Sequence, residues 1–392
     1  MRVTHAYLDH AATAPLRPEA GEEFLRVARE LGNPNAIHTL GRNARRYLDE
    51  AREEVAELLG AEPAEVIFTS GGTEADNLAV QGGWFAAYAK RPGIVVSAVE
   101  HPAVIETAHW LRSQHGAALH VAPVTSSGAV DLEALSDYLE AADAGVSVVS
   151  VMWANNETGV LQPIREIVEL ASRHGARVHS DAVQAAAHVP IDFDASGVSA
   201  LSISGHKIGA PVGIGALLAR REFTPTPHMH GGLQERGIRS GTVNAAGAAA
   251  LAAALRSAVR DQVEEAARLR GLREQLQDGI RAAVPASRVW GEEEERLPGH
   301  LLVSVPGTRS EAVLFSLDMA GVAASAGSAC QAGVVGASPV VLAMGGTEEE
   351  ARSALRFTLG YTTTQADIDA ALELLPTVFD RARAAFAQST MN

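Results

Sequence analysis

The sequence contains one cysteine, Cys330, among its 392 residues. A single cysteine excludes an intramolecular disulfide and any metal site built from several thiolates of one chain. Positive charge is also scarce, because 32 Lys and Arg residues stand against 47 Asp and Glu residues, which gives a formal net charge of −15. This acidic balance argues against a broad nucleic-acid surface, which needs clustered Lys and Arg.

Long apolar runs are missing too, so we expect no segment that crosses a membrane. His5 and Asp9 interrupt the apolar stretch that a secretory signal would need near the start of the chain, and we therefore expect no export. These absences favour a cytoplasmic protein. Hydrophobic residues make up 47% and charged residues 20% of the chain, as in ordinary globular proteins, and the length favours two or three packed units.

Short β-branched runs alternate with helical patterns from residue 60 to about 220, which indicates an α/β fold with a largely parallel sheet. The runs stop at polar residues and lie at 66–69, 94–99, 146–153, 177–180 and 201–203. Ligands of open α/β sheets bind just beyond the carboxyl ends of the strands. We therefore expect the reactive side chains that follow these runs to share one site.

The second part of the chain has a different pattern. Residues 244–283 are rich in Ala and then in Glu and Arg at helical spacing, which predicts a long helix leaving the large domain. Strand-like segments at 301–305 and 355–359 and an amphipathic helix at 366–387 predict a smaller unit. The predicted division is an N-terminal arm at 1–15, a large domain at 16–258 and a small C-terminal domain at 259–392.

The segment 70–74 reads Ser-Gly-Gly-Thr-Glu between a predicted strand and an apolar helical run. Free backbone N–H groups at Gly72, the hydroxyl of Thr73 and the positive end of a helix dipole suit a phosphate. A glycine turn that merely caps a helix has the same appearance. Further residues must decide between the two interpretations.

Lys207 follows a predicted strand in Ser204-Gly205-His206-Lys207 and precedes an apolar, glycine-containing stretch. A lysine in such surroundings loses its proton readily and can form a Schiff base with an aldehyde. Asp181, at the preceding strand end, is suited to pair with a protonated pyridine nitrogen, which points to pyridoxal 5'-phosphate (PLP). The alternatives are an exposed loop lysine and a helix-capping aspartate.

Other polar residues at strand ends fit the same site. Gln184 lies three residues after Asp181 and would face the same way on a helical turn. The ring of His101 could stack on a cofactor, or could cap a helix. Asn156 could bind a ring oxygen or the substrate, or could only stabilise its own turn.

Arg356 alternates with Leu355 and Phe357, so we expect it on the opposite face of its strand, where it could bind a carboxylate at two points or lie at the surface. Cys330 lies among small residues, which predicts a mobile loop rather than a buried structural thiol. His228 and His230 lack suitably spaced further ligands, so we predict no metal site there.

These segments together resemble the cysteine desulfurase family of PLP-dependent enzymes, in the class V aminotransferase-like, fold type I group. The resemblance runs over nearly the whole chain, in order, at 7–13, 32–35, 68–74, 100–101, 155–159, 181–184, 204–207, 231–236, 239–242, 327–330 and 356–360. It implies an α/β PLP-dependent transferase fold with a mostly parallel seven-stranded sheet in the large domain and a smaller α+β C-terminal domain.

The resemblance also implies a role for each matching residue. Lys207 would carry PLP, Asp181 would pair with the pyridinium nitrogen, and His101 would stack on the ring and take part in catalysis. The ring hydroxyl would lie near Gln184 and Asn156, and Arg356 would clamp the substrate carboxylate, with Asn156 nearby. The phosphate would be held by Gly72, Thr73, Ser204, His206 and, from a second subunit, Thr242.

The implied reaction converts L-cysteine to L-alanine, with sulfur transferred to Cys330 as a persulfide. The contact by Thr242 implies a homodimer with shared active sites, and the persulfide implies a sulfur-acceptor protein, either an iron–sulfur scaffold or a transfer-RNA thiolation enzyme. Val212 and Ser338-Pro339 depart from residues that are frequent in the family, and the second departure leaves the acceptor open. A PLP lyase acting on selenocysteine or another sulfur amino acid, and a non-catalytic scaffold of sulfur assembly, are the alternatives.

Overall fold

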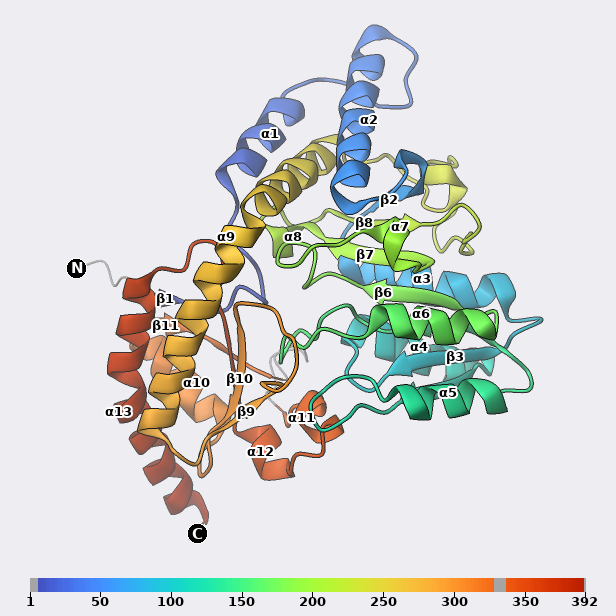
Figure 1. Cartoon of the computed structure of the whole chain (residues 1–392). Coiled ribbons are helices and arrows are strands. Elements are labelled where there is room, and N and C mark those ends of the chain that lie inside the picture. The colour runs from blue at the N-terminus through green and yellow to red at the C-terminus, as the bar shows by residue number, and fades with distance from the viewer. Residues whose placement is uncertain (1–5, 328–335, 391–392) are drawn as a thin grey trace.

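The computed structural model describes residues 6–327 and 336–390. Figure 1 shows two sheet-containing bodies side by side, with the long helix α9 (Ala245–Ala283) running from one along the flank of the other. The helix expected at 244–283 is thus confirmed. The bounds of the N-terminal arm and of the two domains stay a prediction, because α9 passes through residues 258 and 259 without a break.

The larger sheet has seven strands in the order β2-β8-β7-β6-β5-β3-β4. They are β2 (Val66–Thr69), β3 (Gly93–Ser97), β4 (Ala118–Ala122), β5 (Val146–Ser150), β6 (Arg177–Asp181), β7 (Ala200–Ser204) and β8 (Gly215–Ala219). Strand β8 pairs antiparallel with β2 and β7, and the remaining pairs are parallel. The expected mostly parallel, seven-stranded sheet is confirmed.

Strand bounds differ from the expected runs where burial continues past a strand end. The run at 146–153 was expected to be one strand, but β5 ends at Ser150, while Val151 and Met152 remain buried next to the pocket described below. Hydrophobic composition therefore reports burial there and not strand length. The expected runs also omit β8, which begins with Gly-Ala, and the half-exposed edge strand β4.

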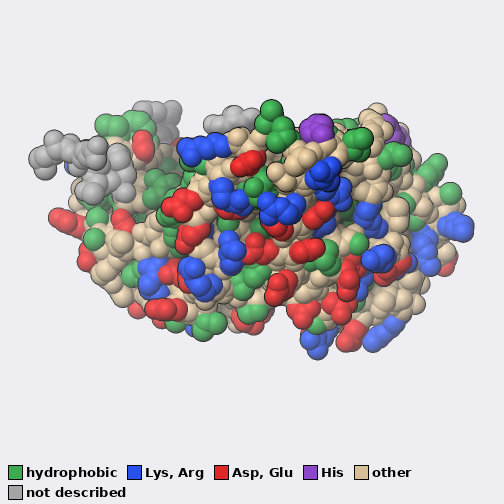
Figure 2. Space-filling model, turned by 90° about the horizontal axis from the view of Figure 1, so that it is seen from above, with side chains coloured by type: hydrophobic (Ala, Val, Ile, Leu, Met, Phe, Trp, Pro, Cys, Tyr) green, Lys and Arg blue, Asp and Glu red, His purple; other side chains and the backbone are tan. Residues whose placement is uncertain are grey.

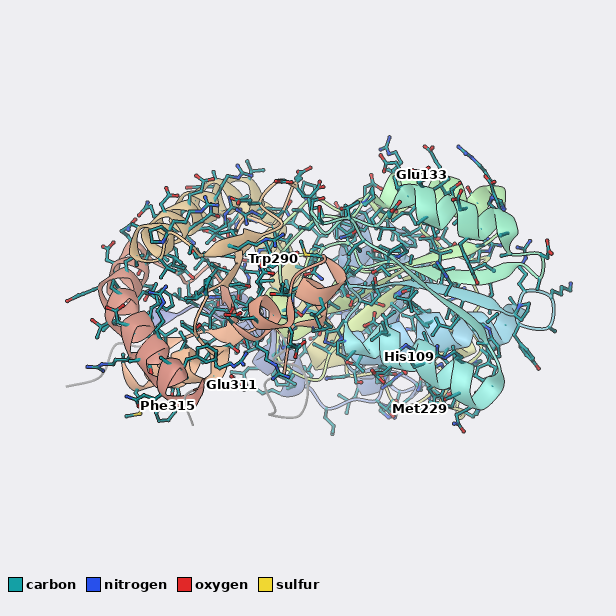
Figure 3. The ribbon with its side chains drawn as sticks, turned by 90° about the horizontal axis from the view of Figure 1, so that it is seen from below. His109, Glu133, Met229, Trp290, Glu311 and Phe315 are labelled. Atoms are coloured by element: carbon teal, nitrogen blue, oxygen red, sulfur yellow. The ribbon has the colours of Figure 1, made fainter. Side chains whose placement is uncertain are left out.

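Helices cover both faces of the larger sheet because alternate strand residues point to opposite sides. Ile94 and Val96 of β3 pack with α3 (Gly72–Ala87) and α4 (Pro102–His115), whereas Val95 belongs to the core on the other face. That face carries α5 (Leu132–Ala141), α6 (Ile164–Arg173) and the short α7 (Phe193–Ser196). Figure 3 shows His109 of α4 and Glu133 of α5 on opposite sides of the sheet.

Two further helices extend the larger body beyond the sheet. Helices α1 (Pro18–Ala28) and α2 (Thr39–Leu59) pack against α9. The shortest elements are α8 (Gly205–Ile208), η1 (Pro63–Glu65) and η2 (Glu235–Gly237). Helix α8 follows β7 directly, and so the chain turns away from the sheet at the position of Lys207.

The smaller body contains an antiparallel sheet in the order β12-β13-β10-β9. Its strands are β9 (Arg288–Trp290), β10 (His300–Ser304), β12 (Ser325–Ala326) and β13 (Ala354–Thr358), and a separate parallel pair joins β1 (Ala6–Tyr7) to β11 (Val322–Ala323). The accompanying helices are α10 (Ser310–Met319), α11 (Pro339–Ala343), α12 (Glu348–Arg352) and α13 (Gln365–Thr390). Strands expected at 301–305 and 355–359 and the helix expected at 366–387 are present, each within a residue or a few of its expected bounds.

The smaller sheet has two different faces. Leu355 and Phe357 pack with α9 and α13 in one core, while Leu302 on β10 joins Met152 of the larger body and Val341 of α11 in another. Arg356 lies on the second face, as the alternation predicts. This face meets the larger body, and Arg356 is therefore buried at a junction instead of lying at the surface.

Charged side chains of both signs are interspersed on the face shown in Figure 2. Among the described residues, no helix combines the length and apolar character needed to span a bilayer. Phe315 on α10 is 70% exposed and lies at the rim of the smaller body (Figure 3).

Candidate active site

A pocket of about 480 Å³ opens at the carboxyl ends of the parallel strands. The expected site residues that line it are Gly72, Thr73, His101, Asn156, Asp181, Gln184, Ser204, His206 and Lys207. These residues come from five separate stretches of sequence. Their convergence follows from the parallel topology, because the strands end at the same edge of the sheet.

One corner of the pocket is the N-terminus of α3. Gly72 begins this helix, and a Cβ there would lie 2.7 Å from Val183 Cγ2, so a larger residue would not fit. Glu74 does not point freely into the corner, because it accepts hydrogen bonds from Ser70 N–H at 2.7 Å and from Arg239 Nε at 2.8 Å. The corner therefore offers backbone N–H groups, the Thr73 hydroxyl and a positive helix end to an anion.

Lys207 is half-buried and points back to the N-terminal stretch of the chain. Its ammonium group donates to the backbone carbonyl oxygens of Ala11 and Ala12. The neighbouring His206 contacts Thr13 Oγ1 through Nδ1 at 3.2 Å. The exposed loop lysine, which was the alternative interpretation, is thus wrong, since the turn at 11–13 forms a wall against Lys207.

Asp181 is the last residue of β6 and is buried. One of its carboxylate oxygens accepts a hydrogen bond from Val183 N–H at 2.8 Å. Asp181 therefore also caps the turn that follows it, as the alternative interpretation predicts. Burial raises the pKa of Asp181 to about 6, and the nearby Lys207 charge opposes this rise. A cation in the pocket would restore its negative charge fully at neutral pH.

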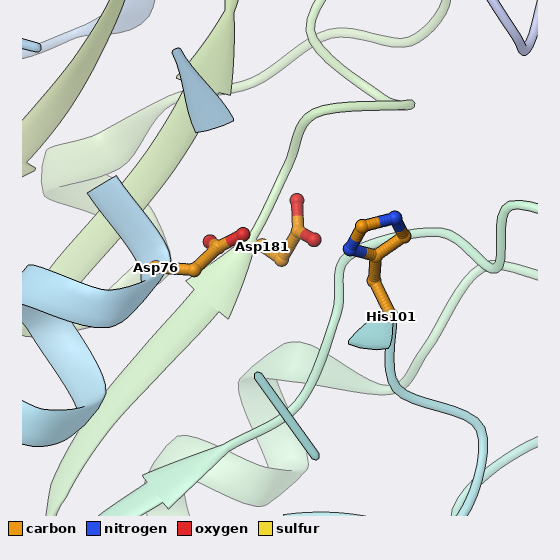
Figure 4. Close-up of side chains that lie close together, drawn as sticks. All are labelled: Asp76, His101 and Asp181. Carbon is orange, nitrogen blue, oxygen red and sulfur yellow. The ribbon is translucent and has the colours of Figure 1, made fainter. Parts of the chain in front are cut away.

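Asp76 of α3 was not singled out from the sequence, although it lies beside Asp181. One ligand atom each from Asp76, His101 and Asp181 lies within 4.8 Å of the others, and Figure 4 shows the two carboxyl groups and the ring turned toward one another. Asp76 is 1% exposed, and its Oδ1 has no hydrogen-bond partner among the described residues. Burial first, and then the charge of Asp181, raises the pKa of Asp76 well above its usual value.

A buried histidine lies beneath this carboxyl group. His179 Nε2 is 3.6 Å from Asp76 Oδ1, and the ring contacts the hydroxyls of Ser150 and Ser202, each at 2.9 Å. Burial lowers the pKa of His179 to about 3, so the ring is neutral. The sequence carried a weak signal for this residue, because a histidine inside a buried strand needs polar partners.

His101 both caps a helix and lines the pocket. Its Nδ1 accepts a hydrogen bond from Ala103 N–H at 3.1 Å at the start of α4. Burial lowers the pKa of His101 to about 4, and the charges of Lys207 and Arg356 act in the same direction. The ring is therefore neutral near pH 7, with Nε2 assigned as the protonated nitrogen because Nδ1 accepts.

Arg356 connects the smaller sheet to the pocket wall. It is 2% exposed, and it donates to Asn156 O at 3.1 Å and to Asp9 Oδ1 at 3.0 Å. Its Nε has no hydrogen-bond partner among the described residues. Asp9 was missed as a site residue, because only the tertiary structure brings the N-terminal stretch next to β13.

The same N-terminal stretch holds Gln184, whose amide donates to Ala11 O at 3.0 Å. Thr242 is exposed and does not line the pocket of this chain. Cys330 lies outside the described residues. His228 and His230 are exposed.

The doubly covered, mostly parallel sheet and the lysine and aspartate at its strand ends define a class of α/β enzymes with a strand-end active site. More specifically, the chain belongs to the aminotransferase class-V family, whose family model matches residues 6–371.

Individual relatives match over almost their whole length. An IscS-like cysteine desulfurase of Mycobacterium tuberculosis is 48% identical over 384 residues, which cover 97% of this chain and 98% of that protein. The cysteine desulfurase NifS of Azotobacter vinelandii is 40% identical and covers 96% of this chain and 93% of its own length. The structure of a NifS-like protein from Rickettsia africae superposes with a TM-score of 0.87 at 32% identity, over 96% of this chain and 99% of that chain.

Proposed function

We propose that this protein is a PLP-dependent cysteine desulfurase that converts L-cysteine to L-alanine and transfers the sulfur to Cys330. The single observation that carries the proposal is that Lys207 and Asp181 line one pocket at the carboxyl ends of β7 and β6. The relatives named above, which are cysteine desulfurases at 40–48% identity over nearly the whole chain, support the same activity.

The residues of the pocket fit PLP. The α3 N-terminus with Gly72 and Thr73 suits the phosphate, the buried Asp181 carboxyl suits a protonated pyridine nitrogen, and Lys207 suits the aldehyde. The pocket volume of about 480 Å³ leaves room for a small amino acid beside a ring of this size. PLP, when bound, supplies an electron sink for chemistry at the substrate Cα.

The chain's own residues would bind the substrate and move its protons. Lys207 would take the Cα proton as a general base, and its half-buried position among the carbonyls of Ala11 and Ala12 keeps it oriented. Neutral His101 could exchange a proton through Nε2. Arg356, already fixed by Asp9 and by the Asn156 carbonyl, would orient the substrate carboxylate.

The sulfur step balances without an added oxidant. The thiolate of Cys330 forms a bond to the substrate sulfur while the bond between that sulfur and the substrate Cβ breaks. The electron pair of the broken bond is protonated at Cβ, and the products are L-alanine and a persulfide on Cys330. The persulfide sulfur would then pass to an acceptor protein, for which an iron–sulfur scaffold or a transfer-RNA thiolation enzyme is suitable.

The proposed assembly is a homodimer in the cytoplasm. The exposed Thr242 does not line the pocket of its own chain, which supports a role for its hydroxyl at the phosphate of a second subunit.

Cys330→Ser provides the test of this function. The variant should keep the yellow colour of the bound cofactor and lose alanine production from L-cysteine in the presence of a thiol. Alanine yields from L-cysteine, selenocysteine and a cysteine sulfoxide conjugate, measured on the unmodified protein, distinguish the desulfurase from a lyase for another sulfur amino acid. Full turnover by Cys330→Ser would remove this thiol from the reaction, and a purified protein without PLP would favour a non-catalytic scaffold.

A further inference from the structure

The pocket wall that carries Asn156 is a tight, buried turn. Asn155 Oδ1 accepts hydrogen bonds from the backbone N–H groups of Glu157 at 3.0 Å and Thr158 at 2.9 Å, and its amide donates to Val99 O at 3.0 Å. These contacts fix the turn to the end of the larger sheet. Asn156 and Glu157, adjacent on this turn, are therefore held in constant relation to the pocket.

Glu157 is 3% exposed and makes contacts that the proposed reaction has not used. Its Oε2 accepts a hydrogen bond from Ser338 Oγ at 2.5 Å. The same oxygen lies so close to Gly327 that a Cβ on this glycine would overlap it. One carboxylate oxygen thus touches both Gly327 and Ser338.

Gly327 and Ser338 flank the stretch of sequence that carries Cys330. On one side, Ala326 pairs with Leu355 of β13. On the other side, Ser338 N–H donates to Ala351 O at 3.1 Å, and Ser338 Oγ accepts from Val341 N–H and so caps α11. Both flanks are tied to the smaller body, and Glu157 is a polar residue of the larger body that lies against both of them.

A second cavity of about 240 Å³ lies beside the pocket and shares Asn156 and Pro102 with it. Glu157, Gly327 and Ala337 line this cavity. Burial raises the pKa of Glu157 to about 7, while the hydrogen bond from Ser338 and the charge of Arg356 oppose the rise. At pH 8 the group is therefore mostly an ionised carboxylate, which accepts a strong hydrogen bond from Ser338.

We infer that Glu157 is a positioning residue for sulfur transfer, which holds both flanks of the Cys330 segment against the turn that carries Asn156. The inference rests on the proposed function. Since Asn156 O also accepts from Arg356, the same turn links the substrate carboxylate site to the flanks of the thiol segment. Loss of the Glu157 contact should therefore slow transfer to Cys330 and leave L-cysteine binding intact.

The test follows two signals in one single-turnover experiment on the holoenzyme at pH 8. L-Cysteine is mixed with the protein without reductant, and the change in cofactor absorbance reports substrate binding. Alkylation and mass spectrometry at timed intervals report persulfide on Cys330. Glu157→Gln keeps the shape of the side chain but replaces a charged acceptor by a neutral one, so persulfide formation should slow about tenfold with an unchanged absorbance change.

Ser338→Ala removes the other half of the contact and should slow persulfide formation by a similar factor. It also removes the cap of α11, so Thr347→Ala, which removes the cap of the neighbouring α12, is the matched control for lost capping. Glu100→Gln replaces another buried carboxyl group on the same cavity, whose hydrogen bonds come from Ser97 and Met152 and not from Ser338. Both controls should form persulfide at the rate of the unmodified protein.

The inference is overturned if Glu157→Gln forms persulfide at the unmodified rate. It is also overturned if the absorbance change and persulfide formation slow by the same factor, because that outcome indicates a general structural role. The proposed function fails separately, if the unmodified protein itself forms no persulfide with L-cysteine.

Discussion

The two sides of the pocket are built in different ways. On the lysine side, formed by Gly72, Thr73, Asp181 and Lys207, each residue stands where a strand of the larger sheet ends or the next helix begins. On the arginine side, Asn156 lines the pocket and contacts the buried Arg356, which also contacts Asp9; these residues come from a buried turn, the smaller sheet and the N-terminal stretch. The backbone of one sheet positions the first group, and side-chain contacts between two bodies position the second.

This difference predicts different responses to mutation. A substitution on the lysine side removes a chemical group but leaves the strand ends in place, because backbone hydrogen bonds hold them. A substitution on the arginine side also weakens the contact between the two bodies, because the Arg356 guanidinium is one of the groups that bridge them. Chemistry should be lost on the first side, and substrate affinity on the second.

Lys207→Ala should give the largest effect, a loss of activity of about 10³-fold or more, since the general base and the Schiff-base amine are both removed. Borohydride reduction followed by peptide mapping should find the cofactor adduct on Lys207 in the unmodified protein and no adduct in the variant. Lys90 is the only other lysine of the chain, and so Lys90→Ala is the matched control. An adduct that persists in Lys207→Ala would break the lysine side of the comparison.

Arg356→Lys should raise KM for L-cysteine about 10- to 100-fold, because an ammonium group cannot reproduce the planar fork that reaches Asp9, the Asn156 carbonyl and a substrate carboxylate together. Cofactor absorbance without substrate should stay the same. Arg352→Lys alters an exposed arginine of α12, paired with Glu348, and should leave KM unchanged. A fall in kcat alone, with constant KM, would contradict a role in substrate binding.

Asp9→Asn should raise KM by a smaller factor, about three- to tenfold, since Arg356 keeps its contact with Asn156 O and loses one charged partner. Steady-state kinetics would measure this effect, and Asp49→Asn, which removes an exposed partner of Arg45, is its control. An effect as large as that of Arg356→Lys would mean that the arginine side behaves as one cooperative unit.

Glu100→Gln tests how a buried carboxyl group of the larger body affects the pH dependence of stability. Burial raises the pKa of Glu100 to about 8, above its usual value near 4.5. The folded protein therefore binds an extra proton between these two pH values, and its stability falls as pH rises through this window. The variant lacks this titrating group. The difference between its free energy of unfolding and that of the unmodified protein should therefore rise by up to about 1.4 kcal/mol for each pH unit within this window. Urea unfolding at pH 5.5, 7 and 8.5 measures the trend, and parallel curves would contradict it.

The lysine side could be predicted from the sequence because its signals are local. The polar residues at 70–73, 181–184 and 204–207 each follow an apolar run directly, and parallel strands bring such ends together. Asp76 and His179 were not predicted as parts of this side. Asp76 lines the pocket from the interior of α3, and His179 is buried beneath it in β6; at both positions the sequence pattern is that of an ordinary core.

The arginine side could be predicted only in part. Alternation along β13 correctly placed Arg356 on the face opposite Leu355 and Phe357. It did not predict that this face packs against the larger body. Asp9 and the carbonyls of Ala11 and Ala12 carry no local mark of a site. They become a wall because β1 pairs with β11 and residue 9 bridges to Thr358, far along the chain.

The sequence by itself determined which residues are chemically suited to the pocket, and it determined the order of strands and helices that brings most of them to one edge of a sheet. Periodicity and strand ends are properties of neighbouring residues, and these can be read along the chain. Only the tertiary structure decided that Asp9 meets Arg356, that His179 lies beside Asp76, and that Glu157 lies against Gly327 and Ser338. Such contacts join residues up to several hundred positions apart, and their distances depend on how complete surfaces pack.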